Sequence, residues 1–281
     1  MPVSNALPPL REVIRLHNLR AEKSLGQNFL LDSNITDKIV RVAGDLKGVH
    51  AIEIGPGPGG LTRSLLAGGA ESVMFIEFDP RAVEALQSLA AAYPGKLTIT
   101  QADALKTDVT TLAPAPRAVV ANLPYNIATP LLIGWLRQIR QNPANIHSMT
   151  LMFQKEVAER ITAPPGGKAY GRLAVIAGWL CKAKKVYDLP PSAFIPPPKV
   201  SSAVVHFVPL ALSPDAPDFE TVEALTAQAF GQRRKMIRAS LKDHMEAIEA
   251  LGLPPTARAE ELSVADFIAL AGKIKSVPKR P

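Results

Sequence analysis

Between residues 51 and 153 the sequence alternates short apolar runs with longer amphipathic segments, and this alternation limits the possible folds more than any other feature. The apolar runs predict strands at 51–55, 72–79, 97–103, 117–122 and 148–153. The intervening segments predict helices at 60–68, 81–92 and 129–139, the last with Thr129 as N-cap and Pro130 at its first position. Such alternation is typical of an α/β protein with a doubly wound parallel sheet.

The pattern changes after Tyr170. The sequence there predicts a helix at 173–181, then strands at 186–189 and 202–208 on either side of a proline-rich stretch. We expect these strands to close the sheet as an antiparallel pair. The stretch 213–218 is typical of a linker, and only helical patterns follow it. We therefore predict one domain at 1–213, in which residues 1–20 form a mobile lead, and a small helical domain at 214–281.

Composition narrows the functional classes. Hydrophobic residues make up 47% of the 281 residues, enough for a substantial core. The single cysteine, Cys181, excludes an internal disulfide and fits a reducing compartment. The five histidines are too scattered to suggest a metal site, and no apolar run approaches the roughly 20 residues of a membrane span. We therefore expect a monomeric cytoplasmic protein without a metal or a membrane anchor.

Positive charge is concentrated in one segment. The net charge of +7 favours a polyanionic partner such as nucleic acid. Residues 231–242 contain five basic residues and no acid, and a helix here would place Arg234, Arg238 and Lys242 on one face. The alternative is an ordinary solvated helix face.

Polar side chains stand at the ends of four predicted strands. Glu53, Glu77, Asp103 and Asn122 occupy these positions. In open parallel sheets, ligands bind beyond the carboxyl ends of the strands, where the strand order reverses. Polar turn residues would explain one such acid but explain the four together poorly. The sequence therefore predicts a ligand site at this edge of the sheet.

A glycine-rich turn follows the first of these strands. The stretch Gly55-x-Gly57-x-x-Gly60 matches a dinucleotide-binding fingerprint, and Glu77 lies 22 residues after its first glycine. However, Pro56 and Pro58 have no backbone N–H, so the turn is poorly suited to holding a pyrophosphate. The prolines therefore argue against a nicotinamide cofactor.

S-adenosylmethionine carries no phosphate and suits these residues better. Glu77 would accept hydrogen bonds from its ribose hydroxyls, and Asp103 would accept one from its adenine amine. Gly55 and Gly57 would let the backbone approach the ligand closely. Glu53 would help to hold the cationic end.

The tetrapeptide Asn122-Leu123-Pro124-Tyr125 follows a buried strand and carries the chemistry for a flat base. The Asn122 amide oxygen and the Leu123 carbonyl can accept hydrogen bonds from an exocyclic amine. Pro124 stiffens the turn, and Tyr125 offers a ring on which a base can stack. The sequence therefore predicts methyl transfer to an adenine amine.

Several short motifs occur in order along the chain and resemble those of the ribosomal RNA adenine N6,N6-dimethyltransferase family. They are Leu25-Gly-Gln-Asn-Phe-Leu30, Glu53-Ile-Gly-Pro-Gly57, Ile76-Glu-Phe-Asp79, Gln101-Ala-Asp103, Asn122-Leu-Pro-Tyr125, Gln154-Lys-Glu156, Tyr170-Gly-Arg172, Pro190-Pro-Ser-Ala-Phe194, Pro196-Pro-Pro-Lys-Val200 and Phe230-Gly-Gln-Arg-Arg-Lys235. The resemblance covers nearly the whole chain. It implies a Rossmann-like class I methyltransferase sheet with a small all-helical C-terminal domain.

The resemblance also implies a reaction and its residues. The reaction is dimethylation of two adjacent adenosines near the 3′ end of small-subunit rRNA, on an immature small ribosomal subunit. The implied S-adenosylmethionine contacts are Asn28, Leu30, Gly55, Glu77, Asp103 and Asn122. The implied base pocket consists of Asn122, Leu123, Tyr125 and Phe194. The basic segment would bind rRNA phosphates through Arg233, Arg234, Lys235 and Arg238.

Three other functions stay open on the sequence. A DNA adenine methyltransferase would share the amide, proline and aromatic chemistry. A dinucleotide-dependent oxidoreductase would share the glycine turn. A non-enzymatic factor that checks immature ribosomal subunits is also compatible with the basic segment, and that role could coexist with catalysis.

Overall fold

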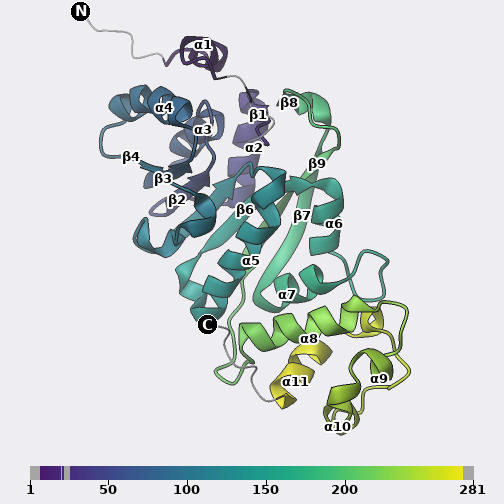
Figure 1. Cartoon of the computed structure of the whole chain (residues 1–281). Helices are drawn as coiled ribbons and strands as arrows, with labels where there is room; N and C mark the ends of the chain where they lie inside the picture. The colour runs from purple at the N-terminus through teal and green to yellow at the C-terminus, as the bar shows by residue number, and fades with distance from the viewer. Residues whose placement is uncertain (1–6, 20, 22–25, 275–281) are drawn as a thin grey trace, which may run out of the picture. The chain divides into compact units, whose positions relative to one another are not determined.

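The computed structural model describes residues 7–19, 21 and 26–274 (Figure 1). Seven strands form one sheet in the order β4-β3-β2-β5-β6-β9-β7. The strands are β2 (His50–Ile54), β3 (Ser72–Glu77), β4 (Leu97–Gln101), β5 (Arg117–Ala121), β6 (Ser148–Gln154), β7 (Cys181–Leu189) and β9 (Ser202–Pro209). The first five are mutually parallel, and β9 runs antiparallel to β6. The predicted mostly parallel sheet with an antiparallel closing strand is confirmed.

The central strands are buried along nearly their whole length and are mostly apolar. β5 and β6 carry continuous runs of buried residues, whereas β4 at the edge of the sheet has none. Continuous apolar strands are what a parallel sheet covered on both faces requires. The strand order reverses between β2 and β5, which pair with each other in parallel. This reversal defines the edge where a ligand site is expected.

Helices alternate with the strands as the sequence predicts. They are α2 (Ser33–Ala43), α3 (Gly60–Ala67), α4 (Pro80–Ala92), α5 (Tyr125–Gln141), α6 (Lys155–Ile161) and α7 (Arg172–Leu180). α2 contacts β5 and β6, while α3 and α4 contact β3. The start of α5 differs from the prediction, because the helix begins at Tyr125 and Pro130 lies inside it. Pro124 stands directly before this helix and its carbonyl accepts from Ile127 N–H, so the earlier proline, not Pro130, marks the start.

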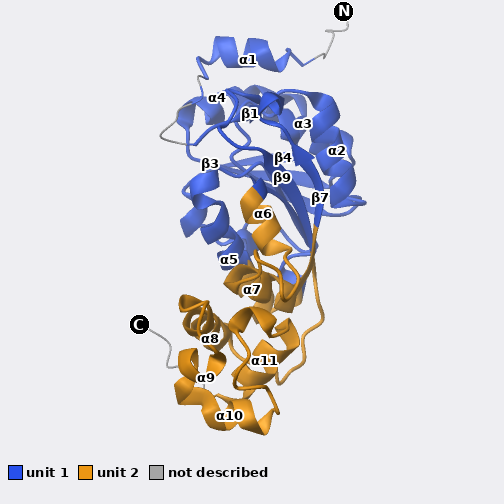
Figure 2. Ribbon diagram, turned by 90° about the vertical axis from the view of Figure 1, so that its right-hand side faces the viewer, with its two compact units in different colours: residues 1–135, 144–155, 185–207 blue, residues 136–143, 156–184, 208–281 orange. Residues whose placement is uncertain are grey.

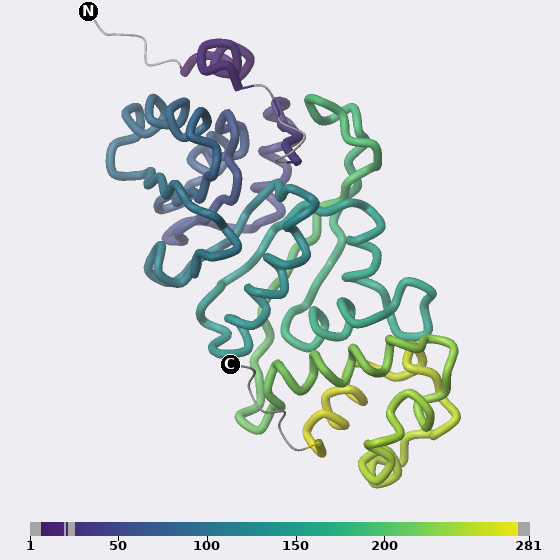
Figure 3. The backbone as a smooth tube through the Cα atoms, in the orientation of Figure 1, coloured from purple at the N-terminus to yellow at the C-terminus, as the bar shows by residue number. Residues whose placement is uncertain are grey.

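A second, two-stranded sheet was not anticipated from the sequence. It pairs β1 (Phe29–Leu30) with β8 (Phe194–Ile195) in antiparallel register. These segments are far apart along the chain but lie side by side (Figure 3). Strands of two residues leave no periodic pattern in a sequence, which is why neither was predicted. An N-terminal helix, α1 (Leu10–Leu16), packs through Val13 on Ala82 and Ala85 of α4.

The chain divides into two compact units (Figure 2). Unit 1 contains residues 1–135, 144–155 and 185–207, and unit 2 contains residues 136–143, 156–184 and 208–281. The linker expected at 213–218 therefore lies inside unit 2. The division into domains at 1–213 and 214–281 concerns function and stays a prediction.

Unit 2 is built around helices and aromatic contacts. Its helices include α7, α8 (Phe219–Gly231), α9 (Ile237–Ser240), α10 (Met245–Ala250) and α11 (Val264–Lys273). The rings of Trp179 and Phe219 are stacked with centroids 6.3 Å apart, and those of Phe230 and Phe267 are 5.5 Å apart. Aromatic pairs of this kind add to the stabilisation from apolar burial.

Candidate active site

A cavity of about 340 Å³ opens at the carboxyl ends of β2, β3, β4 and β5 in unit 1. The segment 26–30 supplies another part of its wall. The predicted cofactor residues all line this cavity: Asn28, Leu30, Gly55, Gly57, Glu77, Asp103 and Asn122. Leu123, Pro124 and Tyr125 line it as well. The structure thus brings together ten predicted residues from five separate parts of the chain, because parallel strands end at a common edge.

The glycine turn after β2 allows close approach of the backbone. Gly55 and Gly57 have φ values of +65° and +54°, a left-handed conformation that favours glycine. A Cβ on Gly57 would lie 2.8 Å from the Phe29 ring, so only glycine lets that ring pack there. A Cβ on Gly55 would meet no atom within 4 Å. Because Gly55 lines the cavity, a side chain at this position would occupy space open to a ligand.

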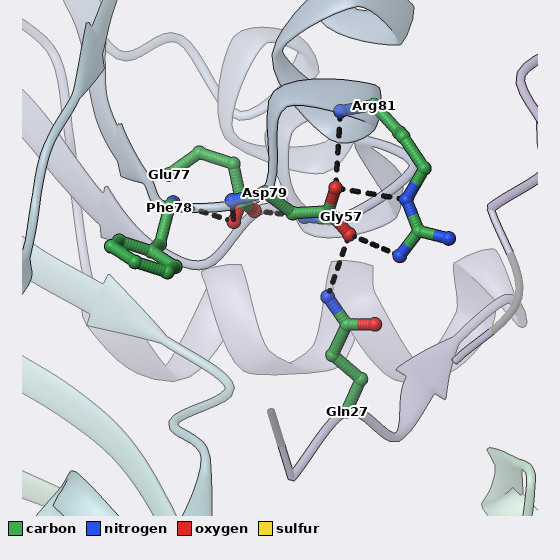
Figure 4. A network of polar contacts seen from close by, with 6 residues as sticks. All are labelled: Gln27, Gly57, Glu77, Phe78, Asp79 and Arg81. Atoms are coloured by element: carbon green, nitrogen blue, oxygen red, sulfur yellow. Dashed lines mark hydrogen bonds and ion pairs between the residues drawn. The ribbon is translucent and has the colours of Figure 1, made fainter. Parts of the chain in front are cut away.

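Glu77 is held at the end of β3 by three backbone groups (Figure 4). Its Oε1 accepts hydrogen bonds from the N–H groups of Phe78 (2.8 Å) and Asp79 (2.9 Å), and its Oε2 accepts one from Gly57 (3.3 Å). Burial raises the pKa of Glu77, while these backbone bonds oppose the rise. A carboxylate oxygen can accept two hydrogen bonds, so Oε2 keeps one acceptor position for a ligand hydroxyl.

A neighbouring network connects the segment 26–30 to the end of β3 (Figure 4). Gln27 Nε2 donates to Asp79 Oδ2 at 3.3 Å. The same carboxylate accepts two bonds from the Arg81 guanidinium, at 3.0 and 2.7 Å, and it caps α4. Arg81 thereby lowers the pKa of Asp79. The network holds this wall of the cavity against the turn that carries Glu77.

Glu53, at the end of β2, is a second buried acid. Its side chain is 2% exposed and accepts a hydrogen bond from Thr62 Oγ1 at 2.7 Å. Burial raises the pKa of Glu53 to about 8, and the charge of Glu77 adds to the rise. A cation in the cavity would favour the ionised form. The site therefore holds a proton that a cationic ligand can displace.

The part of the cavity wall formed by Asp103, Phe78 and Leu105 is more exposed and partly apolar. Asp103 is half-buried, and its Oδ1 accepts from Leu105 N–H at 3.0 Å. The side chains of Phe78 and Leu105 line the cavity although they are 64% and 49% exposed. Exposed apolar side chains at a cavity suit a flat ring. Neither residue was predicted from the sequence to line the site, although each is a large apolar residue one or two positions after a strand-end acid.

Asn122 has a fixed orientation. Its Nδ2 donates to the backbone carbonyl of Asn28 at 2.8 Å, so the amide oxygen points away from that carbonyl. Leu123 is buried at 2% exposure, and Tyr125 opens α5 with its ring half-buried at the cavity wall. The Tyr125 hydroxyl is hydrogen-bonded to Ser202 Oγ. The tetrapeptide thus presents an acceptor and an aromatic ring at one place.

Phe194 is not brought to the cavity. Its side chain is 2% exposed and belongs to a core cluster with Leu30, Ile39 and Val204. The expectation that Phe194 lies in the base pocket is therefore not met in this structure. β8 pairs with β1 and places Phe194 opposite Leu30, and the Phe194 ring packs into this core cluster. The sequence pattern did not reveal this pairing.

Comparison with known proteins decides the family. The family model for ribosomal RNA adenine dimethylase matches residues 18–275. The chain belongs to the ribosomal RNA adenine dimethylase family. Two curated proteins named ribosomal RNA small subunit methyltransferase A are each 55% identical to it. The one from Azorhizobium caulinodans matches over 96% of this chain and 94% of that protein, and the one from Paracoccus denitrificans over 99% and 100%.

Solved structures agree with the family. A dimethyladenosine transferase from Plasmodium falciparum has a TM-score of 0.73 at 27% identity, covering 85% of this chain and 94% of that one. The 23S rRNA methyltransferase ErmE has a TM-score of 0.66 at 26% identity, covering 87% and 98%. The fold is that of a class I methyltransferase, and the protein is an S-adenosylmethionine-dependent enzyme.

The cavity of this adenine dimethylase fits S-adenosylmethionine. Gly55 leaves space at the wall, Glu77 keeps an acceptor position, and Glu53 offers a carboxyl that a cation would ionise. Within the described ranges there is no cluster of three or more His, Cys, Asp or Glu residues that could hold a metal ion. No helix in the described part of the chain has the length and apolar character that a membrane crossing needs.

The basic segment in unit 2 differs from its prediction. Residues 232–235 form a turn, and Met236 makes an isolated antiparallel bridge with Arg258. The prediction of one continuous helix with Arg234, Arg238 and Lys242 on a single face is therefore wrong. The bridge requires extended backbone at Met236 (φ −67°, ψ 152°), which interrupts the helix between α8 and α9.

The four residues of this segment that were predicted to bind phosphates differ in their contacts. Arg233 Nη2 donates to the backbone carbonyls of Lys168 and Tyr170, at 3.0 and 2.9 Å, and lies 3.3 Å from Glu260 Oε2. Arg233 thus connects parts of unit 2. Arg234, Lys235 and Arg238 are exposed, as is Arg233 itself.

Proposed function

We propose that this protein dimethylates N6 of two adjacent adenosines near the 3′ end of small-subunit rRNA. The observation that carries the proposal is the fixed amide of Asn122 beside the cofactor cavity. Relatives at 55% identity are named small subunit methyltransferases, which supports this RNA as the target. We further propose that the enzyme acts as a monomer in the cytoplasm, on an immature small ribosomal subunit.

Cofactor binding is assigned to one part of the cavity. When bound, S-adenosylmethionine supplies an electrophilic methyl group. We propose that Glu77 accepts from a ribose hydroxyl through Oε2 and that Asp103 accepts from the adenine amine. Asn28, Leu30, Gly55 and Gly57 contribute the surrounding wall. Glu53 balances the cationic end by giving up its proton.

The target base is assigned to the tetrapeptide. The N6 amine of adenine is a weak nucleophile because its lone pair is delocalised into the ring. The Asn122 amide oxygen and the Leu123 carbonyl accept hydrogen bonds from this amine and stabilise the positive charge that grows on it in the transition state. Pro124 stiffens the turn, and the Tyr125 ring stacks on the base to hold it in line with the methyl group.

The proposal also covers the movement of the target base, a second stacking ring and the residues that bind RNA. The base must leave its stack to enter the cavity, as in other base-modifying enzymes. Stacking by Phe194 on the second side of the base would require this buried ring to move out of its core cluster, and it stays a prediction. The basic residues Arg233, Arg234, Lys235 and Arg238 are proposed to bind rRNA phosphates, with the last three contributing most because the Arg233 guanidinium already donates to backbone carbonyls.

A labelling experiment tests the substrate. Purified protein is mixed with methyl-labelled S-adenosylmethionine and with one of three acceptors: small ribosomal subunits that lack this modification, large-subunit rRNA, or duplex DNA. Nucleoside digestion then identifies the product. Label in dimethyladenosine from the small subunit alone supports the proposal. Label from large-subunit RNA or DNA would replace the proposed substrate, and S-adenosylmethionine binding without transfer to any acceptor would contradict it.

A further inference from the structure

One hydrogen bond at the cavity has no part in the roles described so far. It joins the hydroxyl of Tyr125 to Oγ of Ser202. Tyr125 is the first residue of α5 and lines the cavity, whereas Ser202 is the first residue of β9 and is fully buried. The bond therefore connects a ring at the cavity to the interior of the sheet.

The Ser202 side of this bond is rigid. Ser202 pairs with Gln154 at the end of the β6–β9 ladder, and the carbonyl of the preceding Ser201 accepts from Lys155 N–H at 2.9 Å. β6 pairs in turn with β5, the strand that leads into the tetrapeptide. Tyr125 follows β5 and Ser202 begins β9, and β6 pairs with both strands in one sheet, so Ser202 Oγ is a fixed point for the Tyr125 ring.

The Tyr125 side of the bond needs such a fixed point. A tyrosine ring rotates about two side-chain torsions, and a ring that stacks on an incoming base contributes most when its orientation is set in advance. A hydrogen bond at the para position fixes the end of the ring farthest from the backbone. Both torsions are thereby restricted before any base arrives.

We propose that Ser202 is a positioning residue of the base pocket, whose hydroxyl holds the Tyr125 ring in the orientation that stacks on the target adenine. This inference rests on the proposed function, because it takes Tyr125 as the stacking residue. It also explains why a polar side chain is retained at a fully buried position of the sheet, where an unpartnered hydroxyl would destabilise the fold.

The test is a double-mutant cycle with Tyr125→Phe and Ser202→Ala. Tyr125→Phe keeps the ring and removes only the hydroxyl, so each single variant breaks the same bond. We expect each to lower kcat/KM for the RNA about five- to tenfold, the size of one hydrogen bond, with an unchanged Kd for S-adenosylmethionine. The double variant should be no worse than either single variant.

Two controls separate positioning from folding. Ser201→Ala removes a hydroxyl one residue earlier and should leave activity and Tm unchanged. Ser202→Thr retains a hydroxyl and should recover most of the kcat/KM lost in Ser202→Ala. Independent, multiplying losses in the double variant would overturn the proposal, as would wild-type activity of Ser202→Ala.

A spectroscopic measurement keeps this inference separate from the substrate. The protein has four tyrosines, so 19F NMR of protein labelled with 3-fluorotyrosine gives few signals, and Tyr125→Phe identifies the one from Tyr125. We expect Ser202→Ala to shift and narrow that signal as the ring gains motion, with or without activity on small-subunit RNA. An unchanged signal would overturn the positioning role even if the proposed reaction is correct, whereas a shifted signal without methyl transfer would count against the reaction alone.

Discussion

The cavity in unit 1 and the basic segment at 231–242 in unit 2 were both singled out from the sequence, but the structure supports them in different ways. The cavity residues stand at the ends of parallel strands, and backbone hydrogen bonds fix several of them. The basic segment runs from the end of α8 through a turn into the short helix α9, and its five basic side chains are exposed. Residues at the ends of parallel strands are placed close together by the sheet, so their relative positions follow from their positions in the sequence. The positions of charged side chains in an exposed segment do not follow in this way.

Removing the side-chain amide that follows β5 should have the largest effect on activity. Asn122→Ala should lower kcat for methyl transfer about 10²- to 10³-fold, the usual cost of one lost donor or acceptor for transition-state charge. The Kd for S-adenosylmethionine should rise far less, because Asn122 is one of several residues that line the cofactor cavity. Labelled methyl transfer and calorimetry measure the two effects. A variant that retains most of its activity would show that the fixed amide is not the catalytic group.

Two strand-end acids in the same cavity can be compared directly. Glu77→Gln should weaken S-adenosylmethionine binding about 10- to 100-fold, because a buried carboxylate that accepts from hydroxyls is lost. Asp103→Asn should weaken it about threefold, because Asp103 is half-exposed and its interactions are screened by water. Calorimetry of both variants at one pH provides the test. Equal losses of affinity in the two variants would mean that the greater burial of Glu77 does not strengthen its contact with the cofactor.

Protonation of Glu53 makes stability depend on pH. Its pKa is about 8 in the folded protein against an ordinary value of 4.5, so the folded state keeps a proton that the unfolded state releases. That stability is fully present below pH ~4.5 and is lost as the pH rises through about 8. Between pH ~6 and ~8 the free energy of unfolding should therefore fall by about 2 kcal/mol, which urea unfolding at several pH values would measure. Glu53→Gln should remove this part of the slope. Identical slopes in the two proteins would contradict the buried proton.

The basic segment should show the smallest effect per residue. Substituting Arg234, Lys235 and Arg238 together by alanine should weaken rRNA binding about tenfold at moderate salt and reduce the slope of log K against log salt by about two to three. Arg233→Ala should instead lower the stability of unit 2 by about 1 kcal/mol, because its guanidinium is hydrogen-bonded within that unit. Cofactor affinity is the control in both cases. A triple variant with an unchanged salt slope would show that these side chains do not meet phosphates.

Residues 51–153 show how much of the fold local sequence patterns can predict. All five predicted strands there were confirmed to within a few residues, and the strand-end residues Glu53, Glu77, Asp103 and Asn122 line one cavity. The start of α5 was misplaced because a local rule selected Pro130 over Pro124. The short pairing of β1 with β8 gave no pattern to read, and the burial of Phe194 went unforeseen with it.

The sequence by itself predicted the alternation of strands and helices and the chemical identity of the groups at the strand ends, whereas the strand order came from the structure. It could do so because hydrophobic periodicity and turn residues are local properties of the chain. Only the tertiary structure determines the orientation, the protonation and the hydrogen-bond partners of these groups. The orientation of the Asn122 amide and the bond between Tyr125 and Ser202 depend on residues 94 and 77 positions away, and the proton on Glu53 depends on the burial of its carboxyl. Hydrogen bonds and desolvation act through space, so contacts between residues this far apart appear only when the chain is folded.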